Sequence, residues 1–133
     1  MQMISLIDQL FRAKKLKLWL KPYEILSTGE GCGIIEFLTD TLSIDYIKRK
    51  MYTQQGGTQD LLEYFLLNFG KETSDKFIRA RKNFCDSLSA YSLVCYILQI
   101  KDRHNANILL DKEGHMCHID FGFLLTNAPG KGL

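Results

Sequence analysis

Apolar residues recur at helical spacing in three parts of the chain, and each part predicts a helix with one buried face. The first part is residues 1–17, where five apolar side chains precede a basic stretch: Met3, Ile4, Ile7, Leu10 and Phe11. The second part is residues 61–69, which Gly70 ends. The third part, residues 74–100, contains neither Gly nor Pro, so it predicts one long helix or two abutting helices.

The third helical stretch carries the longest apolar face in the chain. Its large apolar residues fall three, four or seven positions apart: Phe77, Phe84, Leu88, Tyr91, Cys95 and Leu98. Burial of one large apolar side chain contributes roughly 1.5 to 3 kcal/mol to stability. We therefore expect this face to be the main source of stability for the larger part of the fold.

Strand-like runs occupy residues 18–27 and 33–38, and the glycine-rich stretch between them predicts a hairpin turn. Its glycines do not follow the G-x-G-x-x-G spacing of a phosphate-binding loop, and no helix follows them. A turn is therefore favoured over a phosphate-binding loop. Further along, residues 43–50 predict a short helix capped by Ser43, and residues 51–59 predict a polar loop.

A second hairpin is predicted in residues 101–122, KDRHNANILLDKEGHMCHIDFG, where two apolar runs flank a polar turn that contains Gly114. If the two strands pair, Asn107 and Asp120 lie at the same open end of the hairpin, although they are thirteen residues apart in the sequence. An amide oxygen and a carboxylate then converge on one point. Hard oxygen ligands of this kind suit Mg²⁺, which completes its coordination with water and nucleotide phosphates.

The spacing of three polar residues predicts phosphoryl-transfer chemistry at this hairpin. Asp102 precedes Asn107 by five residues, and Asp-Phe-Gly begins at Asp120. The same order and spacing occur in the kinase catalytic loop and its metal-binding motif, where the first Asp handles the hydroxyl proton and the other two residues hold metal. The alternative is an ordinary surface turn in which His104 and Asn105 are solvated and Asp120 caps a helix.

Composition and charge add few constraints. The 133 residues suffice for one domain, and 46% hydrophobic with 24% charged residues is ordinary for a soluble globular protein. A net charge of +2 gives no indication of a nucleic-acid partner. Neither a signal peptide nor a run of eighteen apolar residues is found.

The cysteines form no C-x-x-C motif, so we expect reduced, mostly buried thiols in a cytosolic protein: Cys32, Cys85, Cys95 and Cys117. A zinc site built from His115, Cys117 and His118 is disfavoured, because alternation along a strand would point His118 away from the other two.

The order Asp-Arg-His at residues 102–104 replaces the His-Arg-Asp of eukaryotic protein kinases and resembles the phosphatidylinositol 3- and 4-kinase family. Within that family, YSLVCYILQIK followed by DRHNANILLDKEGHMCHIDFGFLL is most similar to the type III beta phosphatidylinositol 4-kinases. Further matches are LWLKPYEIL and SIDYIKRK. The resemblance runs from about residue 18 to residue 129, with a gap around residues 51–57.

The resemblance implies an α+β, protein-kinase-like two-lobe fold in incomplete form. Residues 1–39 would form part of the small lobe, with a helix, two strands and the hinge between the lobes. Residues 40–133 would form part of the large lobe, with the catalytic loop, the metal-binding hairpin and the start of the activation loop. The phosphate-covering loop and lysine of a complete small lobe are not recognised in the chain, so it resembles the middle of a kinase domain.

The resemblance also implies ATP and Mg²⁺ as cofactors. Ile35 to Thr39 would form the hinge, with the Glu36 carbonyl and the Leu38 amide as partners of adenine. The residues implied to bind the cofactors are Tyr23, Ile35, Glu36, Leu38 and Ile119 for the nucleotide, and Asn107 and Asp120 for the metal. From the sequence pattern alone, core packing would be the favoured interpretation of Tyr23 and Ile35.

For catalysis, the family match offers His104 as base or charge stabiliser, because an imidazole exchanges a proton near neutral pH. Asp102 would help to orient the hydroxyl, and Arg103 would brace the loop. The implied reaction transfers the γ-phosphate of ATP to the 4-hydroxyl of phosphatidylinositol in membranes. A cytoplasmic protein peripheral on membranes, and by resemblance on the Golgi, is implied, with no nucleic-acid partner and no indication of protein partners.

Three alternatives stay open at this point. A phosphatidylinositol 3-kinase would use the same chemistry on another hydroxyl. A catalytically incomplete nucleotide-binding or scaffold module would fit the unrecognised phosphate-covering loop, although a decoy has no need of metal ligands. A helical adaptor held together by residues 58–100 is the weakest alternative.

Overall fold

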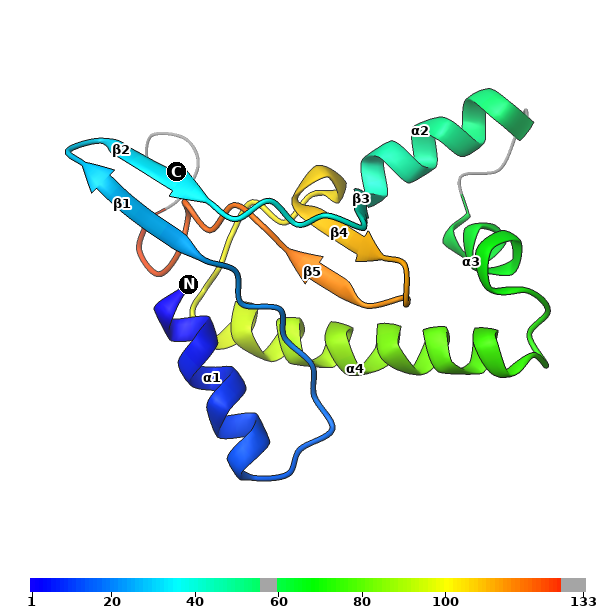
Figure 1. Ribbon diagram of the computed structural model, residues 1–133, viewed down its shortest axis with the longest axis horizontal. Coiled ribbons are helices and arrows are strands. Elements are labelled where there is room, and N and C mark those ends of the chain that lie inside the picture. Colours follow the sequence, from blue (N-terminus) through cyan, green and yellow to red (C-terminus); the bar gives the residue numbers. More distant parts are fainter. Residues whose placement is uncertain (56–59, 128–133) are drawn as a thin grey trace.

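The computed structural model describes residues 1–55 and 60–127 and combines helices with two small antiparallel sheets (Figure 1). The helices are α1 (Gln2–Ala13), α2 (Ile44–Gln55), α3 (Leu61–Phe69) and α4 (Asp75–Ile97), and a single 3₁₀ turn is η1 (Asn105–Asn107). One sheet pairs β1 (Ile25–Gly29) with β2 (Cys32–Ile35), and the other has the order β3 (Thr41–Ser43), β4 (Ile108–Asp111), β5 (Met116–His118). The predicted α+β class is confirmed.

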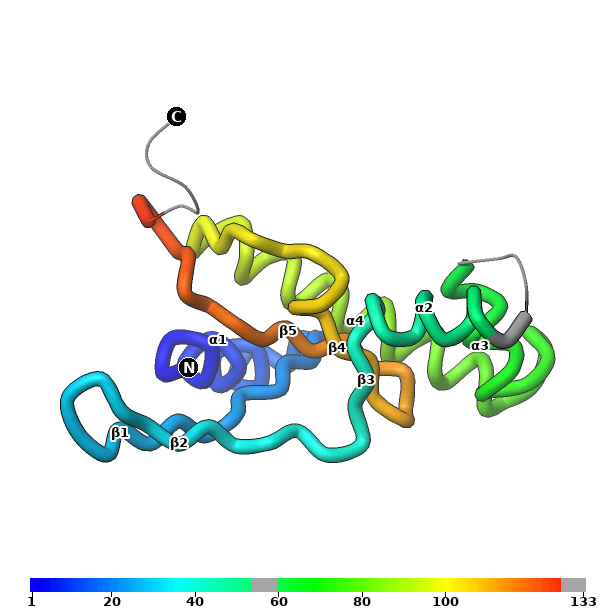
Figure 2. The backbone as a smooth tube through the Cα atoms, turned by 90° about the horizontal axis from the view of Figure 1, so that it is seen from above, coloured from blue at the N-terminus to red at the C-terminus, as the bar shows by residue number. Residues whose placement is uncertain are grey.

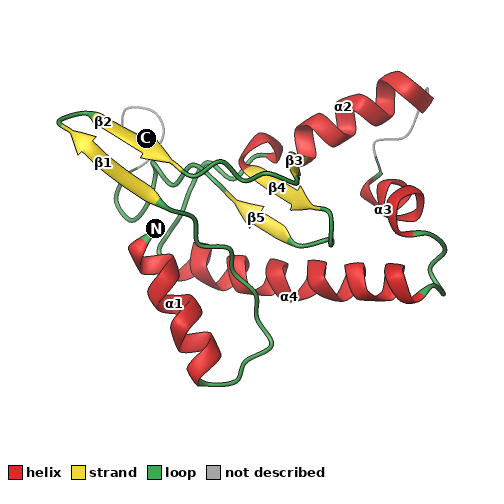
Figure 3. Cartoon of the chain, viewed as in Figure 1, coloured by secondary structure: helices red, strands yellow, loops and turns green. Residues whose placement is uncertain are grey.

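The α4 helix is one continuous helix that runs beside the β4–β5 hairpin (Figure 3). The Ser74 hydroxyl caps it by accepting from the Phe77 amide at 3.2 Å. Its buried face is Phe77, Ala80, Ser87, Ala90, Tyr91 and Val94. The predicted face was wrong at Leu88, which is 41% exposed. Small residues make up half of the buried stripe, because the helix approaches the hairpin closely there.

Two hydrophobic clusters share α4. The first lies between α2, α3, α4 and the second sheet: Ile47, Met51, Phe65, Phe69, Phe77, Ala80, Leu110 and Met116. The second lies between α1, the other end of α4 and β5: Ile4, Leu20, Ala90, Tyr91, Val94, Ile100 and Cys117. Helix α4 therefore connects the two halves of the core.

The β1–β2 hairpin extends away from helices α2 and α3, at the opposite end of the molecule (Figure 2). Its strands pair Ile25 with Ile35, and the Glu36 amide donates to the Glu24 carbonyl at 2.9 Å beyond them. All residues of both strands are exposed. The turn is made at Gly31, whose φ of 68° favours glycine, so the predicted hairpin turn is confirmed.

The structure differs from the sequence-based prediction at four places. Residues 18–24, predicted as strand, are extended but pair with no other strand. Residues 51–55 were predicted as loop, but helix α2 continues through them because Met51 packs in the first cluster. The rest of that predicted loop, residues 56–59, lies outside the described residues. The short strand β3 was not predicted. On α1, Met3 and Leu10 are about half exposed (54% and 52%) rather than buried.

The expectation of mostly buried cysteines was wrong as well. Cys117 is buried, but Cys32 lies on the exposed β1–β2 hairpin and Cys85 on the exposed side of α4.

Over the residues that the structure describes, no helix combines the length and the apolar character needed to cross a lipid bilayer.

Candidate active site

The β4–β5 hairpin brings the predicted metal ligands to one end. Ile108 pairs with His118, and one step further the Ile119 amide donates to the Asn107 carbonyl at 3.0 Å. The hairpin prediction is therefore confirmed, and Asn107 lies opposite the residue that precedes Asp120. At the closed end, one carboxylate oxygen of Asp111 accepts two backbone N–H groups of the turn, each at 2.8 Å.

Asn107 contacts two residues of the predicted catalytic loop, Asp102 and His104. Its amide nitrogen donates to the Asp102 carbonyl at 3.1 Å and lies 3.4 Å from Nε2 of His104. The Asp102 carboxylate is 3.7 Å from the same Nε2. In the described part of the chain no group donates to the Asn107 amide oxygen, so this oxygen is available to a metal ion.

Arg103 connects the predicted catalytic loop to the segment that carries Asp120. Its guanidinium donates to the carbonyls of Lys101 at 3.0 Å, Ile119 at 2.7 Å and Asp120. Its Cζ atom lies 5.4 Å from the centre of the Phe121 ring. Three of the five N–H groups of the guanidinium are therefore used on backbone carbonyls. The bracing role of Arg103 stays a prediction.

Asp120 is exposed and adopts a φ of 57°, in the left-handed region. Its Oδ1 atom accepts from the Gly122 amide at 3.4 Å, a long hydrogen bond that leaves most of the carboxylate accessible. A carboxylate and an amide oxygen at the end of one hairpin fit the chemistry of Mg²⁺, which takes one or two protein oxygens beside water and phosphate. The residues present are therefore suited to the metal that the sequence predicts.

The histidines of β5 and its turn serve packing. The His115 ring stacks on Trp19 with centroids 4.1 Å apart, and its Nδ1 lies 3.0 Å from the Asp111 carboxylate. The His118 ring stacks on Tyr91 with centroids 4.5 Å apart. Within residues 1–55 and 60–127, no group of three or more His, Cys, Asp and Glu side chains could hold a metal ion.

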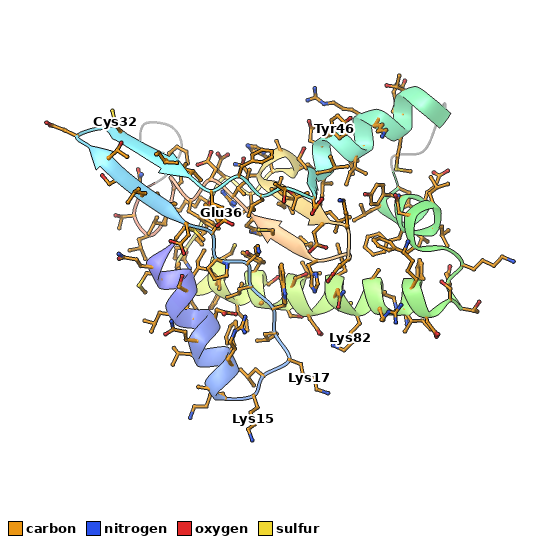
Figure 4. The ribbon with its side chains drawn as sticks, viewed as in Figure 1. Lys15, Lys17, Cys32, Glu36, Tyr46 and Lys82 are labelled. Carbon is orange, nitrogen blue, oxygen red and sulfur yellow. The ribbon has the colours of Figure 1, made fainter. Side chains whose placement is uncertain are left out.

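A cavity of about 850 Å³ lies between the β1–β2 hairpin, β3 and the end of β5. Its walls include every residue predicted to bind the nucleotide, together with one predicted metal ligand: Tyr23, Ile35, Glu36, Leu38, Ile119 and Asp120. Asp102, Arg103, His104 and Asn107 do not line it. Figure 4 shows Glu36 where the chain leaves the β1–β2 hairpin.

The cavity has further walls that sequence reasoning did not assign. Phe121 stacks on Tyr23 with centroids 6.5 Å apart, and its place in Asp-Phe-Gly was the only signal for it. Tyr46 reaches the cavity from α2 (Figure 4), and Leu109 from β4. No local pattern could have identified these two, because their contribution depends on how α2 and β4 are placed by the rest of the fold.

Burial raises the pKa of the Tyr23 phenol, with a smaller contribution from the neighbouring Cys117. Tyr23 is therefore a neutral side chain in the cavity wall at physiological pH. Apart from Asp120 at one edge and Glu36, the walls are mainly apolar and aromatic, which suits a flat aromatic ligand with a polar end.

Comparison with known proteins shows which family the sequence resembles. The sequence model for the family "Phosphatidylinositol 3- and 4-kinase" matches residues 1–132. The chain is 50% identical over 129 residues to a phosphatidylinositol 4-kinase of Dictyostelium discoideum, which covers 97% of this chain and 11% of that protein. It is 47% identical to phosphatidylinositol 4-kinase beta 1 of Arabidopsis thaliana, over 97% of this chain and 11% of that protein.

A mammalian relative, the phosphatidylinositol 4-kinase beta of Sorex araneus, is 42% identical over 96% of this chain and 15% of its own length. The chain thus spans between 11% and 15% of the length of these three relatives. The match includes residues 101–122 and the cavity walls described above. This chain belongs to the phosphatidylinositol 3- and 4-kinase family.

Proposed function

We propose that this chain provides the adenine cavity, catalytic loop and metal-binding hairpin of a phosphatidylinositol 4-kinase, which transfers the γ-phosphate of ATP to the 4-hydroxyl of phosphatidylinositol. The observation that carries the proposal is the meeting of Asp102, His104 and Asn107 at the open end of the β4–β5 hairpin. Asp120, at the same end, borders the 850 Å³ cavity. Residues 1–39 act as part of the small lobe and residues 40–133 as part of the large lobe.

Adenine binds in the cavity between the β1–β2 hairpin and β4. The Glu36 carbonyl and the Leu38 amide pair with its polar edge, since neither group has a hydrogen-bond partner among the described residues. The Leu38 carbonyl is already occupied by the Thr41 hydroxyl at 2.9 Å, which fixes the backbone of the hinge. Tyr23 and Phe121 enclose the ring from the side of the hairpin end.

The phosphates extend from the cavity toward Asp120 and Asn107. These two residues would hold Mg²⁺, which neutralises phosphate charge as it develops during transfer. Arg103 holds the backbone on both sides of this site through its three carbonyl contacts. It acts on positioning and does not contact the nucleotide.

His104 takes the proton of the attacking hydroxyl. The proton arrives at Nε2, and the Asp102 carboxylate, 3.7 Å from this nitrogen, stabilises the protonated ring. The Asn107 amide nitrogen, 3.4 Å from Nε2, gives up this long contact when the hydroxyl enters and keeps its hydrogen bond to the Asp102 carbonyl. Asp102 also helps to orient the hydroxyl.

The lipid substrate requires that the enzyme work at a membrane surface. The chain then meets membranes peripherally from the cytoplasmic side, and the Golgi is the membrane that the family resemblance favours. Imaging of the tagged complete gene product tests that location, and an even distribution through the cytosol would contradict it.

Product analysis tests the proposal as a whole. The complete gene product, incubated with MgATP and phosphatidylinositol vesicles, is expected to form the 4-phosphate. Asp120→Asn should lower the rate roughly 100-fold or more, as expected when a group that stabilises transferring charge is lost. Glu72→Gln, at an exposed carboxylate before α4, is the matched control and should leave the rate unchanged.

A product phosphorylated only at the 3-position would show the phosphatidylinositol 3-kinase instead. Binding of MgATP without any lipid phosphorylation would favour the non-catalytic nucleotide-binding module. Full activity of Asp120→Asn would contradict the assignment of Asp120 to the metal.

A further inference from the structure

Residues 18–24, which connect α1 to β1, are held to the large-lobe elements by contacts other than a β-ladder. We call this segment the connector. The Trp19 amide donates to the Asp86 carbonyl of α4 at 3.4 Å, and the Trp19 ring stacks on His115. Leu20 is buried in the second hydrophobic cluster, only 2% exposed. Tyr23, one residue before the end of the connector, lies in the wall of the nucleotide cavity.

The Tyr91 hydroxyl contributes two of the hydrogen bonds that hold the connector. It accepts from the Lys21 amide at 3.2 Å and donates to the Lys21 carbonyl at 3.4 Å. It also lies 3.6 Å from the Cys117 sulfur of β5. Tyr91 is 1% exposed and comes from the middle of the C-terminal half of α4, seventy residues beyond Lys21. One hydroxyl thus fixes both backbone groups of a residue two positions before Tyr23.

The ring of the same residue contacts the metal-binding hairpin. It stacks on His118 with an interplanar angle of 17°, and His118 is two residues before Asp120. Phe121, directly after Asp120, stacks in turn on Tyr23. The contacts therefore form a closed path from Tyr91 through the connector to the cavity and back through the hairpin.

We propose that Tyr91 is a positioning residue that couples the nucleotide cavity to the metal-binding hairpin, its hydroxyl holding the connector and its ring holding His118. This inference rests on the proposed function for its kinetic readout, but its structural readout is independent of any activity. An apolar side chain of similar volume could fill the same space in the core. Only a tyrosine supplies both the ring stack and the pair of backbone hydrogen bonds.

Two variants separate the two contacts. Tyr91→Phe keeps the ring and removes the hydroxyl, so the connector and Tyr23 lose their fixed position while His118 keeps its stacking partner. In the complete gene product, the KM for ATP should rise about three- to tenfold with kcat nearly unchanged, because both hydrogen bonds that fix Lys21 are lost. Tyr91→Leu removes the stack as well, so kcat should fall and the Mg²⁺ concentration for half-maximal rate should rise.

The matched control is Tyr96→Phe, on the same helix, because Tyr96 is 77% exposed. It should leave both kinetic constants unchanged. If the KM of Tyr91→Phe for ATP equals that of this control, the inference is wrong. The same holds if Tyr91→Phe lowers only kcat, through a smaller folded fraction of the enzyme, because Tyr91 is then an ordinary core residue.

Hydrogen–deuterium exchange provides the readout that does not depend on catalysis. In Tyr91→Phe, peptides that cover residues 18–24 should exchange faster while those from β4 and β5 keep their protection. In Tyr91→Leu, both regions should exchange faster. Unchanged exchange in the connector of Tyr91→Phe would overturn the inference even if the enzyme proves to phosphorylate another substrate. Lack of lipid phosphorylation by the unaltered protein, with the exchange pattern as expected, would instead overturn only the proposed function.

Discussion

At the scale of single residues, we expect Cys117 to make the free energy of unfolding fall at alkaline pH. The side chain is 1% exposed, and its burial raises the pKa of the thiol from 9.0 to about 11. The unfolded chain releases the thiol proton near pH 9, whereas the folded chain retains it. The stabilising contribution is therefore complete below pH 9 and is lost as the pH rises toward 11. A difference of about two pKa values corresponds to roughly 3 kcal/mol.

Cys117→Ala tests this dependence. Between pH 8 and pH 11, the free energy of unfolding from urea titrations should fall more steeply for the unaltered chain than for Cys117→Ala. Cys32→Ala is the control, because Cys32 is exposed at the tip of the β1–β2 hairpin (Figure 4). Parallel pH curves for the chain with and without the Cys117 thiol would contradict the prediction.

Residue spacing was enough to predict which polar residues meet at the end of the β4–β5 hairpin, but not the contacts that hold the surrounding segments in place. Asp102, Asn107 and Asp120 stand at fixed distances in the sequence, so the hairpin alone brings them to one end. Tyr91 and Lys21 meet across seventy positions, and their contact depends on how α4 lies against the connector. No local pattern carries that information. The assignment of catalytic roles to Asp102, Arg103 and His104 stays a prediction.

At the scale of elements, the β4–β5 turn packs directly on α4 at Gly114. A Cβ atom at this position would lie 2.7 Å from the Ala80 carbonyl oxygen and 2.9 Å from its Cα, and Gly114 has a φ of 90°. Gly114→Ala therefore introduces both a backbone clash and a strained conformation. We expect a loss of roughly 2 to 4 kcal/mol in the free energy of unfolding.

The control for this substitution is Gly31→Ala in the other hairpin. Gly31 also has a positive φ, of 68°, but a Cβ atom there meets nothing within 4 Å. Only backbone strain remains, so Gly31→Ala should lower the free energy of unfolding by about 1 kcal/mol. Urea unfolding of the two variants under the same conditions measures the difference, and equal losses would show that the contact with Ala80 is unimportant.

Elements with a strong apolar period were predicted well, and those that depend on packing were not. Leu61–Phe69 and the single helix from Asp75 to Ile97 agree with the pattern, including Gly70 and Ser74 at their ends. The buried stripe of α4 was misplaced because Ala80, Ser87 and Ala90 are too small to be recognised as core positions. Strand β3 has only three residues and exists because Leu42 pairs with Leu110 of the distant β4.

At the scale of the whole molecule, the cavity proposed to bind the nucleotide joins the two parts of the chain that the family resemblance separates at residue 39. Its walls come from the β1–β2 hairpin and connector on one side, and from β3, α2 and the β4–β5 hairpin on the other. A ligand bound there contacts both parts only when they are folded against each other. Ligand binding should therefore stabilise the folded chain as a unit.

Thermal unfolding of the chain with MgATP measures this coupling. The unaltered chain should gain about 2.7 kcal/mol at a ligand concentration 100 times the Kd, with a corresponding rise in Tm. Asn107→Ala should show a lower Tm without ligand, since it loses the hydrogen bond to Asp102, and should also lose the part of the gain that depends on Mg²⁺. ATP with EDTA should then stabilise both proteins equally, because adenine contacts do not involve Asn107.

Two outcomes would contradict this prediction. A full Mg²⁺-dependent gain in Asn107→Ala would show that this amide does not hold the metal. No gain in the unaltered chain would show that residues 1–133 do not form a nucleotide site by themselves.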